Sequence, residues 1–389
     1  MVEPIRVLTV LGTRPEAIKL FPLLQRLRSD GRFASRLCIT GQHRDLVQPV
    51  LELAGLRPDH DLGVMTPEQG LDRLAAALLP AIGVILDAEC PDWLVVQGDT
   101  ITALSAALAA YHRRIPVAHV EAGLRSGNLH HPWPEEGNRR MIGSLAALHF
   151  APTQAAAAAL RAENVVASAI HVTGNTGIDA LCWVKAELEQ RPKLVSKVDA
   201  MLERYHGKRI ICVTVHRREN RGGALHRIAA ALAQIAARSD AAVILPLHPD
   251  PRIRDVLAEQ LSGRPNVELT EPLDYPDFIR LLDRATLILT DSGGLQEEAP
   301  ALGKPVLVLR ETTERPEGIA AGTAMLVGTQ TERIVAETVR LLDDEEAYCT
   351  MARAHNPYGD GRASERIAEA LASRCNPGTS VRSSECPAR

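Results

Sequence analysis

Short apolar runs alternate along the chain with longer segments in which apolar side chains recur every three or four positions. This alternation is typical of βαβ units, in which buried parallel strands are connected by amphipathic helices. In the first half it predicts helices at 102–114 and 153–163, and strands at 6–11, 36–40, 93–97, 116–120, 148–152 and 170–174. In the second half it predicts strands at 209–215, 241–247, 266–270, 286–290, 305–310 and 324–328.

The alternation is interrupted over residues 185–205, where the sequence is charged and carries no strand signal. We interpret this segment as a linker between two doubly wound α/β domains of similar size, which would face each other across a cleft. In such sheets ligands bind outside the carboxyl ends of the strands, so functional residues should directly follow strands. The last stretch, 376–389, has no apolar periodicity and is expected to be a disordered tail.

The composition narrows the class of protein. Apolar residues make up 46% of the 389 residues and charged residues 24%, as in ordinary globular proteins. The net charge of −4 argues against nucleic-acid binding, which normally requires a basic surplus.

Cysteines and apolar stretches bear on the compartment. Seven scattered cysteines without a C-x-x-C pair indicate reduced thiols. The N-terminal segment has no export-signal pattern, and the most apolar stretch, LAAALLPAIGVIL from Leu74, is too short to span a bilayer. We therefore expect a cytoplasmic protein that does not associate with membranes.

The first expected strand runs into the sequence GTRPE at residues 12–16. Pro15 fits the first position of a helix, because its missing N–H is not needed there. Arg14 would then lie at a helix N-terminus, which favours anions, and Lys19 follows about one turn later. A solvated surface helix is the competing interpretation, and this motif alone barely favours an anion site over it.

Three acidic side chains follow or border strand ends in the first half. Asp99 comes after strand 93–97, Glu121 comes after strand 116–120, and Glu135 lies in the loop PWPEEGNR, which two prolines shape. Asp99 could instead cap the following helix, and Glu135 could merely charge the first turn of the next one. Three acids on the rim of one cleft fit acid–base chemistry better.

In the second half, His216 and the two arginines that follow it come directly after strand 209–215. A histidine and arginines at a strand end suit a diphosphate, through charge-assisted hydrogen bonds. An exposed basic turn is the alternative. His248 follows the next strand, and either a binding role or a plain loop position fits it equally well.

The sequence LTDSGGLQEE, at 289–298, places paired glycines between a strand and a helix. The N–H groups around Ser292, Gly293 and Gly294 can hold phosphate oxygens. Glu298 lies about one helical turn later and can accept hydrogen bonds from a ribose diol. A nucleotide therefore accounts for glycines and acid together, whereas the alternative is an ordinary helix N-terminus with surface acids.

These motifs and several others resemble those of the non-hydrolysing UDP-N-acetylglucosamine 2-epimerases. In chain order they are GTRPEAIK, TGQHRD, QGDT, HVEAGLRSG, PWPEEGNR, VTGNTGIDAL, HRREN, LTDSGGLQEEAPALGKPVLVLRETTERPE and AHNPYGDG. The resemblance implies a glycosyltransferase-B-like fold: two Rossmann-like domains facing a deep cleft. It implies a domain with the catalytic acids at 1–177, a UDP-binding domain at 178–360, and a helix at 361–375 that crosses back to the first domain.

Residues and resemblance together predict the site. The catalytic residues would be Asp99, Glu121, Glu135 and His216. The substrate would be bound by Arg14, Lys19, Tyr275, Phe278, Ser292, Gly293, Gly294, Glu298 and Arg310. The resemblance places Arg14 and His216 near the diphosphate, and Tyr275 and Phe278 beside the uracil.

The resemblance implies interconversion of UDP-GlcNAc and UDP-ManNAc by a homodimer that feeds bacterial surface polysaccharides, with no metal or other cofactor. The proton on C2 is not acidic enough for simple removal, because no carbonyl stands next to it. The family instead eliminates UDP to give 2-acetamidoglucal, then adds UDP back with the C2 proton on the opposite face. A carboxylate base, a conjugate acid and a firmly held diphosphate suit that path.

Other functions stay open at this point. The same chemistry could act on another UDP-amino sugar, such as a UDP-diacetamido uronic acid, whose carboxylate would need an extra cation. A hydrolysing epimerase would release ManNAc and UDP, and a retaining glycosyltransferase on the same fold would need an acceptor site. A plain nucleotide-binding module would leave the three acids without a role.

The stretch Gln42-His43-Arg44 matches one through which many bacterial members of the family hold a second UDP-GlcNAc as an activator. Several members also present an arginine in the loop that corresponds to residues 65–69, where this chain has Glu68. A glutamate facing a diphosphate would repel it, whereas an arginine would pair with it. We therefore expect a weaker dependence on the activator than is common in the family.

Overall fold

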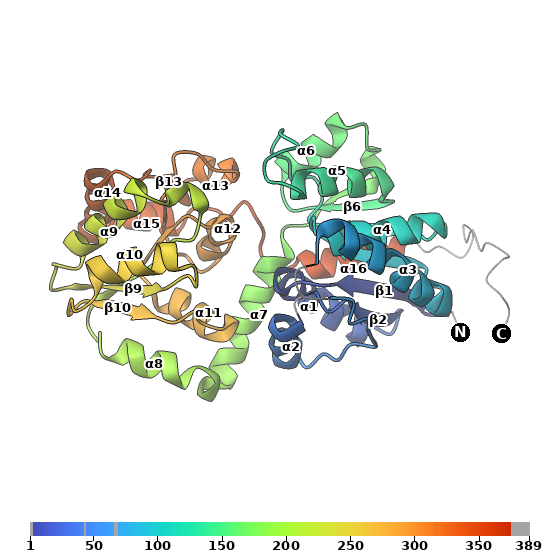
Figure 1. The fold of residues 1–389 in the computed structure, drawn as a ribbon, viewed down its shortest axis with the longest axis horizontal. Helices are drawn as coiled ribbons and strands as arrows, with labels where there is room; N and C mark the ends of the chain where they lie inside the picture. Colours follow the sequence, from blue (N-terminus) through green and yellow to red (C-terminus); the bar gives the residue numbers. More distant parts are fainter. Residues whose placement is uncertain (1–2, 43, 66–68, 375–389) are drawn as a thin grey trace. The chain divides into compact units, whose positions relative to one another are not determined.

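The computed structural model describes residues 3–42, 44–65 and 69–374. They form two compact units: unit 1 comprises the described residues up to 180 and from 359 onward, and unit 2 comprises 181–358. Helix α7 (Thr176–Gln190) runs from unit 1 into unit 2 (Figure 1). His43, Glu68 and the expected tail lie outside the described residues.

Unit 1 is built on a parallel seven-stranded sheet with the order β3-β2-β1-β4-β5-β6-β7. The strands are β1 (Ile5–Leu11), β2 (Phe33–Ile39), β3 (His60–Asp61), β4 (Trp93–Gln97), β5 (Val117–Val120), β6 (Leu148–Ala151) and β7 (Ile170–Val172). All six strands expected in the first half are confirmed. The sequence pattern does not predict β3, because its two residues are too few to show a period.

The helices of unit 1 cover a sheet that is buried on both faces. They are α1 (Arg14–Ser29), α2 (Arg44–Leu53), α3 (Leu71–Glu89), α4 (Ile101–His112), α5 (Glu135–Leu145), α6 (Gln154–Ala162), the short η1 (Ala167–Ala169) and α16 (Ala363–Arg374). Leu8 and Val10 of β1 share a core with α3 and α4, while Val7 and Leu11 are buried on the opposite face. Burial on both faces explains why the strands read as continuous apolar runs.

The C-terminal helix α16 belongs to unit 1 and packs against α1. Asp179 on α7 accepts hydrogen bonds from the backbone N–H of Ala363 (3.1 Å) and of Ser364 (2.7 Å), and so caps α16. Arg32 pairs with Glu369 in the middle of the helix at 2.9 Å. Burial raises the pKa of Asp179, although its hydrogen bonds oppose the shift. Helix α16 is thus fixed to unit 1 at its start and along its length.

Unit 2 contains a second parallel sheet, of six strands, with the order β10-β9-β8-β11-β12-β13. Its strands are β8 (Arg209–Thr214), β9 (Ala241–Pro246), β10 (Val267–Thr270), β11 (Leu287–Thr290), β12 (Val306–Val308) and β13 (Ala324–Leu326). Each corresponds to an expected strand. Ile211 and Val213 of β8 share one core with residues of α9, α10 and α14.

The remaining elements of unit 2 are helical. They are η2 (Pro192–Val195), α8 (Ser196–Glu203), η3 (Arg218–Asn220), α9 (Gly223–Ile235), α10 (Pro251–Leu261), α11 (Tyr275–Arg284), α12 (Gly293–Ala301), α13 (Pro316–Ala320), α14 (Thr331–Asp343) and α15 (Glu345–Ala352). The segment 185–205, expected to link the two domains, consists largely of helices. Val195, Val198 and Leu202 recur every three or four positions and are buried, which folds the segment into helices.

The cysteines and the lengths of the helices bear on the expected compartment. Cys38, Cys212 and Cys349 are free thiols, but Cys90 is disulfide-bonded, so the expectation of reduced thiols is wrong for Cys90. None of the described helices is long and apolar enough to cross a membrane.

Gly123, two residues after Glu121, illustrates how tightly the strand ends of unit 1 are packed. Its φ is +89°, and a Cβ there would lie 2.3 Å from the carbonyl oxygen of Ala156. Gly127 has a similar φ of +78°, but a Cβ there would have nothing within 4 Å.

We expect Gly123→Ala to lower the free energy of unfolding by roughly 3 kcal/mol or more, from strain and overpacking together. Gly127→Ala, its matched control, should cost about 1 kcal/mol. Urea unfolding followed by circular dichroism measures both, and equal shifts would contradict the packing argument.

Candidate active site

The N-terminus of α1 is held by a capping box. Thr13 is the N-cap, and the buried Glu16 carboxylate accepts hydrogen bonds from the backbone N–H of Gly12 (3.0 Å) and of Thr13 (2.7 Å). The hydroxyl of Thr100, in the turn after β4, donates to the other oxygen of Glu16 at 2.6 Å. Burial raises the pKa of Glu16 despite these hydrogen bonds. Glu16 thus fixes two neighbouring strand ends to each other.

Arg14 occupies the first position of α1, one residue earlier than the proline pattern predicts, and Pro15 follows it. Its side chain is half-buried and forms no ion pair with any described residue. Arg14 itself lies in the first turn of the helix, where backbone N–H groups have no partner within the helix. This position suits an anionic ligand.

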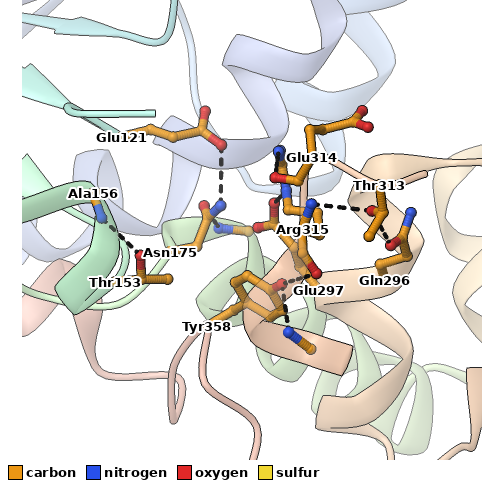
Figure 2. A network of polar contacts seen from close by, with 12 residues as sticks. Glu121, Thr153, Ala156, Asn175, Gln296, Glu297, Thr313, Glu314, Arg315 and Tyr358 are labelled. Carbon is orange, nitrogen blue, oxygen red and sulfur yellow. Dashed lines mark hydrogen bonds and ion pairs between the residues drawn. The ribbon is translucent and has the colours of Figure 1, made fainter. Parts of the chain in front are cut away.

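Glu121 is the centre of a buried polar cluster at the carboxyl edge of unit 1. Lys19 donates to both carboxylate oxygens, at 2.6 and 2.7 Å. Gln97 donates to one oxygen. Asn175 donates to the other at 3.0 Å, and Figure 2 shows this second contact. Glu121 has a left-handed φ of +63°, uncommon for a residue with a side chain. Strain of this kind is found where the surrounding structure fixes a functional side chain.

Asp99 follows β4 but does not cap the next helix. Thr100 is the N-cap of α4, and its hydroxyl accepts the N–H of Ala103 at 3.0 Å. The Asp99 carboxylate forms an ion pair with Arg139 through Oδ2, and its backbone carbonyl accepts from Asn138 at 2.7 Å. The helix-cap alternative is therefore wrong, and Asp99 is tied to α5.

The two glutamates that open α5 have contrasting surroundings. The Glu136 carboxylate is fully buried and accepts hydrogen bonds from the backbone N–H of Ser126 and from Arg140, both at 2.9 Å. Burial alone would raise its pKa, but these donors and the nearby arginines lower it overall. The Glu135 side chain forms no hydrogen bond with any described residue, and its Oε2 is buried. Buried carboxylate oxygens normally have a partner, so an exception indicates a functional position.

In unit 2, the buried carboxylate of Asp291 organises the segment after β8. It accepts the backbone N–H of His216 (3.0 Å) and of Arg217 (2.8 Å), and the side-chain amide of Asn220 (2.9 Å). Nδ1 of His216 lies 3.0 Å from Oδ1 of Asp291. The ring of His248 stacks on that of His216 with centroids 6.2 Å apart. His248 therefore belongs to this cluster.

Helix α12 begins at Gly293, directly after Ser292. The N–H of Ser292 donates to the hydroxyl of Thr290 at 2.9 Å, whereas the Ser292 side chain makes no capping hydrogen bond. Gly294 is exposed, and a Cβ there would lie 3.8 Å from Oε1 of Glu298. The helix N-terminus and the carboxylate of Glu298 are thus neighbours, as a phosphate and an adjoining sugar require.

The paired carboxylates of the LQEE sequence have different surroundings. Glu297 is buried and forms an ion pair with Arg315, so its charge is compensated within unit 2. Figure 2 shows Thr313 donating to Gln296, at 2.6 Å, and the Tyr358 hydroxyl donating to the Arg315 carbonyl, at 3.2 Å. Of the two adjacent acids, Glu298 is therefore the one whose carboxylate lies beside the glycines.

Arg310 is almost completely buried and forms ion pairs with Glu219 and Glu314. Glu314 also pairs with Arg217 at 2.8 Å. Burial would raise the pKa of Glu314, but hydrogen bonding and the two guanidinium groups hold it at about 2. The structure therefore places Arg310 in a charge network of unit 2, where its direct contacts are to carboxylates.

The other expected binding residues are more dispersed. Tyr275 is buried at the start of α11 and Phe278 is half-buried one turn later. The amide oxygen of Gln42 accepts from Thr102 at 2.9 Å, and Arg44 forms an exposed ion pair with Asp61. His43 and Glu68 lie outside the described residues, so the expected weak activation stays a prediction.

Several residues of these clusters are not singled out by the sequence patterns. They are Gln97, Arg139, Asn175, Asp291 and Glu314. Each directly follows a strand or lies in one of the motifs given above, so its position in the sequence was the one feature that could have identified it. Their roles depend on side-chain contacts between distant segments, which spacing alone does not encode. The described residues contain no group of three or more His, Cys, Asp or Glu that could hold a metal ion.

Two parallel sheets, each with charged and polar groups gathered at its carboxyl edge, define a two-domain α/β enzyme of the nucleotide-binding class. The family model for UDP-N-acetylglucosamine 2-epimerase matches residues 25–372. The chain therefore belongs to the UDP-N-acetylglucosamine 2-epimerase family, which confirms the resemblance seen in its motifs.

Relatives of known name agree. The UDP-N-acetylglucosamine 2-epimerase of Escherichia coli (strain K12) is 50% identical over 368 residues, covering 94% of this chain and 98% of that protein. The enzyme of the same name from Yersinia pestis is 50% identical over 371 residues, with the same shares covered. The crystal structure of UDP-GlcNAc 2-epimerase from Neisseria meningitidis bound to UDP-GlcNAc is 42% identical, with a TM-score of 0.85. It covers 95% of this chain and 100% of that one.

Proposed function

We propose that this chain interconverts UDP-GlcNAc and UDP-ManNAc by eliminating UDP and adding it back at the opposite face of C2. The observation that carries the proposal is the division of chemistry between the units. Unit 1 gathers Asp99, Glu121 and Glu135 at its carboxyl edge, and unit 2 places His216 and a glycine-rich helix N-terminus at its own. Relatives bound to UDP-GlcNAc support the substrate. We further infer a cytoplasmic homodimer that feeds surface polysaccharide synthesis.

Unit 2 is proposed to hold the nucleotide. His216 and the N–H groups of Gly293 and Gly294 bind the diphosphate, with Arg14 of unit 1 as a second cation. Glu298 accepts hydrogen bonds from the ribose, and Tyr275 and Phe278 border the uracil. Binding the diphosphate firmly stabilises UDP as a leaving group, which is the main electrostatic demand of the elimination.

The acids of unit 1 are proposed to act on the sugar, with different roles. Lys19, Gln97 and Asn175 occupy the oxygens of Glu121, which suits a carboxylate that stays ionised and holds Lys19 in place. Glu135 has a buried oxygen without a partner, which suits a group that takes and returns a proton. Asp99 uses only Oδ2 in its ion pair with Arg139, leaving Oδ1 for a second proton transfer.

In the elimination, the C2–H bond breaks, its proton goes to a carboxylate, and its electron pair forms the C1–C2 double bond. The C1–O bond breaks, and UDP leaves with the electron pair of the C1–O bond. In the addition, a proton reaches C2 from the opposite face, and a UDP oxygen bonds to C1. Two carboxylates, one for each face, meet this requirement, and we assign Glu135 and Asp99 to them.

The nucleotide site is tested by removing its two proposed cations. Arg14→Ala and His216→Ala are each expected to weaken UDP binding by about 1.5–3 kcal/mol, because each removes a charge-assisted hydrogen bond. Isothermal titration calorimetry with UDP measures the loss. The matched controls are Arg6→Ala and His206→Ala. Arg6 lies near the start of β1 and pairs with Asp92, and His206 is an exposed residue of unit 2. Unchanged affinity in both site variants would overturn the proposed nucleotide site.

A further inference from the structure

The contacts of Asp291 fix the hydrogen-bonding state of His216. The carboxylate is fully buried, and three of its partners are N–H groups that only donate, from His216, Arg217 and Asn220. Burial would raise the pKa of Asp291, but the contact with the His216 ring and the backbone N–H groups of Arg217 and His216 lower it overall. A carboxylate in this setting only accepts, so the nitrogen facing it, Nδ1 of His216, must carry a hydrogen.

This tautomer has a consequence at the other ring nitrogen. A neutral imidazole with hydrogen on Nδ1 carries a lone pair on Nε2. Nε2 of His216 forms no hydrogen bond with a described residue, and the side chain is 38% exposed. Ionised phosphate oxygens only accept hydrogen bonds. An Nε2 atom that carries a lone pair is also an acceptor, so the two could not form a hydrogen bond. Nε2 can donate to a diphosphate only when the ring carries a second proton.

We propose that Asp291 is a positioning residue that directs Nδ1–H of His216 at its carboxylate, so that binding a nucleoside diphosphate requires uptake of a proton on Nε2. The proton comes from solvent and forms one N–H bond, and no other bond changes. The proposal rests on the proposed function, in which His216 contacts the diphosphate. It adds that the nucleotide is bound by an imidazolium whose positive charge Asp291 stabilises.

The charged groups around His216 are consistent with one protonation event. His248 stacks on the ring from the loop after β9, and its Nδ1 accepts the backbone N–H of Asp250 at 3.1 Å, so this nitrogen is unprotonated. Arg217 is paired with Glu314 from the loop after β12. The Asp250 carboxylate is paired with two arginines, Arg221 and Arg252. Asp291 is thus the carboxylate that contacts the His216 ring among the described residues.

The test is calorimetry of the full-length enzyme with UDP at pH 8, in phosphate and in Tris, two buffers with different ionisation enthalpies. The difference between the observed enthalpies gives the number of protons taken up. Histidine side chains change charge between pH 5 and 8, and the terminal phosphate of UDP is ionised at pH 8, because its second pKa is about 6. We expect an uptake approaching one proton per UDP, and an affinity that falls up to tenfold per pH unit as pH rises.

Three variants locate the proton. His216→Gln and Asp291→Asn are expected to bind UDP more weakly and with almost no proton uptake. In Asp291→Asn the amide can donate to Nδ1, which moves the hydrogen to Nε2 without a second proton. His248→Gln, the control, should take up as many protons as the unaltered enzyme. Equal uptake by the unaltered enzyme and His216→Gln overturns the proposal, as does full uptake by Asp291→Asn.

A second measurement needs no substitution of Asp291, in case Asp291→Asn does not fold. Two-bond ¹H–¹⁵N correlation spectra of ¹⁵N-histidine-labelled enzyme report the tautomer, with His216→Gln identifying the signal. We expect Nδ1–H alone at pH 8 without ligand, and both nitrogens protonated with UDP. A hydrogen on Nε2 alone in the unliganded enzyme overturns the proposal. Failure of the unaltered enzyme to bind UDP would instead overturn the proposed nucleotide site.

Discussion

Replacing Glu135 by glutamine is expected to lower kcat for epimerisation by roughly 10²–10⁴-fold, the usual contribution of a positioned acid or base. Oε2 of Glu135 is buried and has no hydrogen-bond partner among the described residues. Glutamine keeps the shape of the side chain but cannot take a proton. UDP affinity should be unchanged, because the nucleotide is proposed to bind through His216 and the glycines of unit 2.

A kcat from initial rates and a Kd for UDP from calorimetry decide this prediction. The neighbouring Glu136→Gln is the matched control, because its carboxylate is fully engaged by Ser126 and Arg140. We expect it to lower the midpoint of urea unfolding more than Glu135→Gln does, and to lower kcat far less. A Glu135→Gln enzyme with near-normal turnover would remove Glu135 from the proton-transfer step.

Glu121→Gln is expected to lower both turnover and stability. The side chains of Lys19 and Glu121 are 24% and 6% exposed, so the substitution leaves a largely buried ammonium group without its counter-ion. Breaking a buried pair costs about 3–5 kcal/mol, and the partial exposure of Lys19 reduces the expected loss to roughly 2–3 kcal/mol. We expect kcat to fall by about 10²-fold or more, because Lys19 then loses its fixed position.

A double-mutant cycle separates the two effects. Lys19→Met combined with Glu121→Gln removes both charges, so the double variant should regain much of the stability that Glu121→Gln loses. Its turnover should stay low, since the ion pair is proposed to serve the sugar site. Recovery of activity together with stability would show that the pair has only a structural role.

The strands could be predicted from the sequence because both sheets are buried on both faces. The runs 93–96 and 211–213 are apolar throughout, and each is followed by a polar residue near the carboxyl edge of its sheet. The short β3 has too few residues to show an alternating pattern. In 185–205 the many charged residues made the buried positions at helical spacing hard to recognise. Periodicity therefore located the sheets but did not reveal the helices of this segment.

The site could be predicted as a set of positions, whereas its contacts could not. Asp99 and Thr100 are equally good caps by sequence, and only the structure shows that Thr100 caps the helix. The glycines after β11 drew attention to a phosphate, yet Asp291, just before them, holds His216. Arg310 was expected to bind substrate, and its guanidinium instead contacts Glu219 and Glu314. Such pairings join segments that are far apart in sequence, so the spacing of residues along the chain does not predict them.

In the proposed reaction the C2–H bond is broken and remade while UDP leaves and returns. Incubation of the purified enzyme with UDP-GlcNAc in D2O, followed by NMR, reports on that bond itself. We expect UDP-ManNAc with deuterium at C2, deuterium entering C2 of the remaining UDP-GlcNAc, and much slower exchange with Glu135→Gln. UDP-ManNAc that keeps its C2 hydrogen, or accumulation of free ManNAc and UDP, would contradict the proposed reaction.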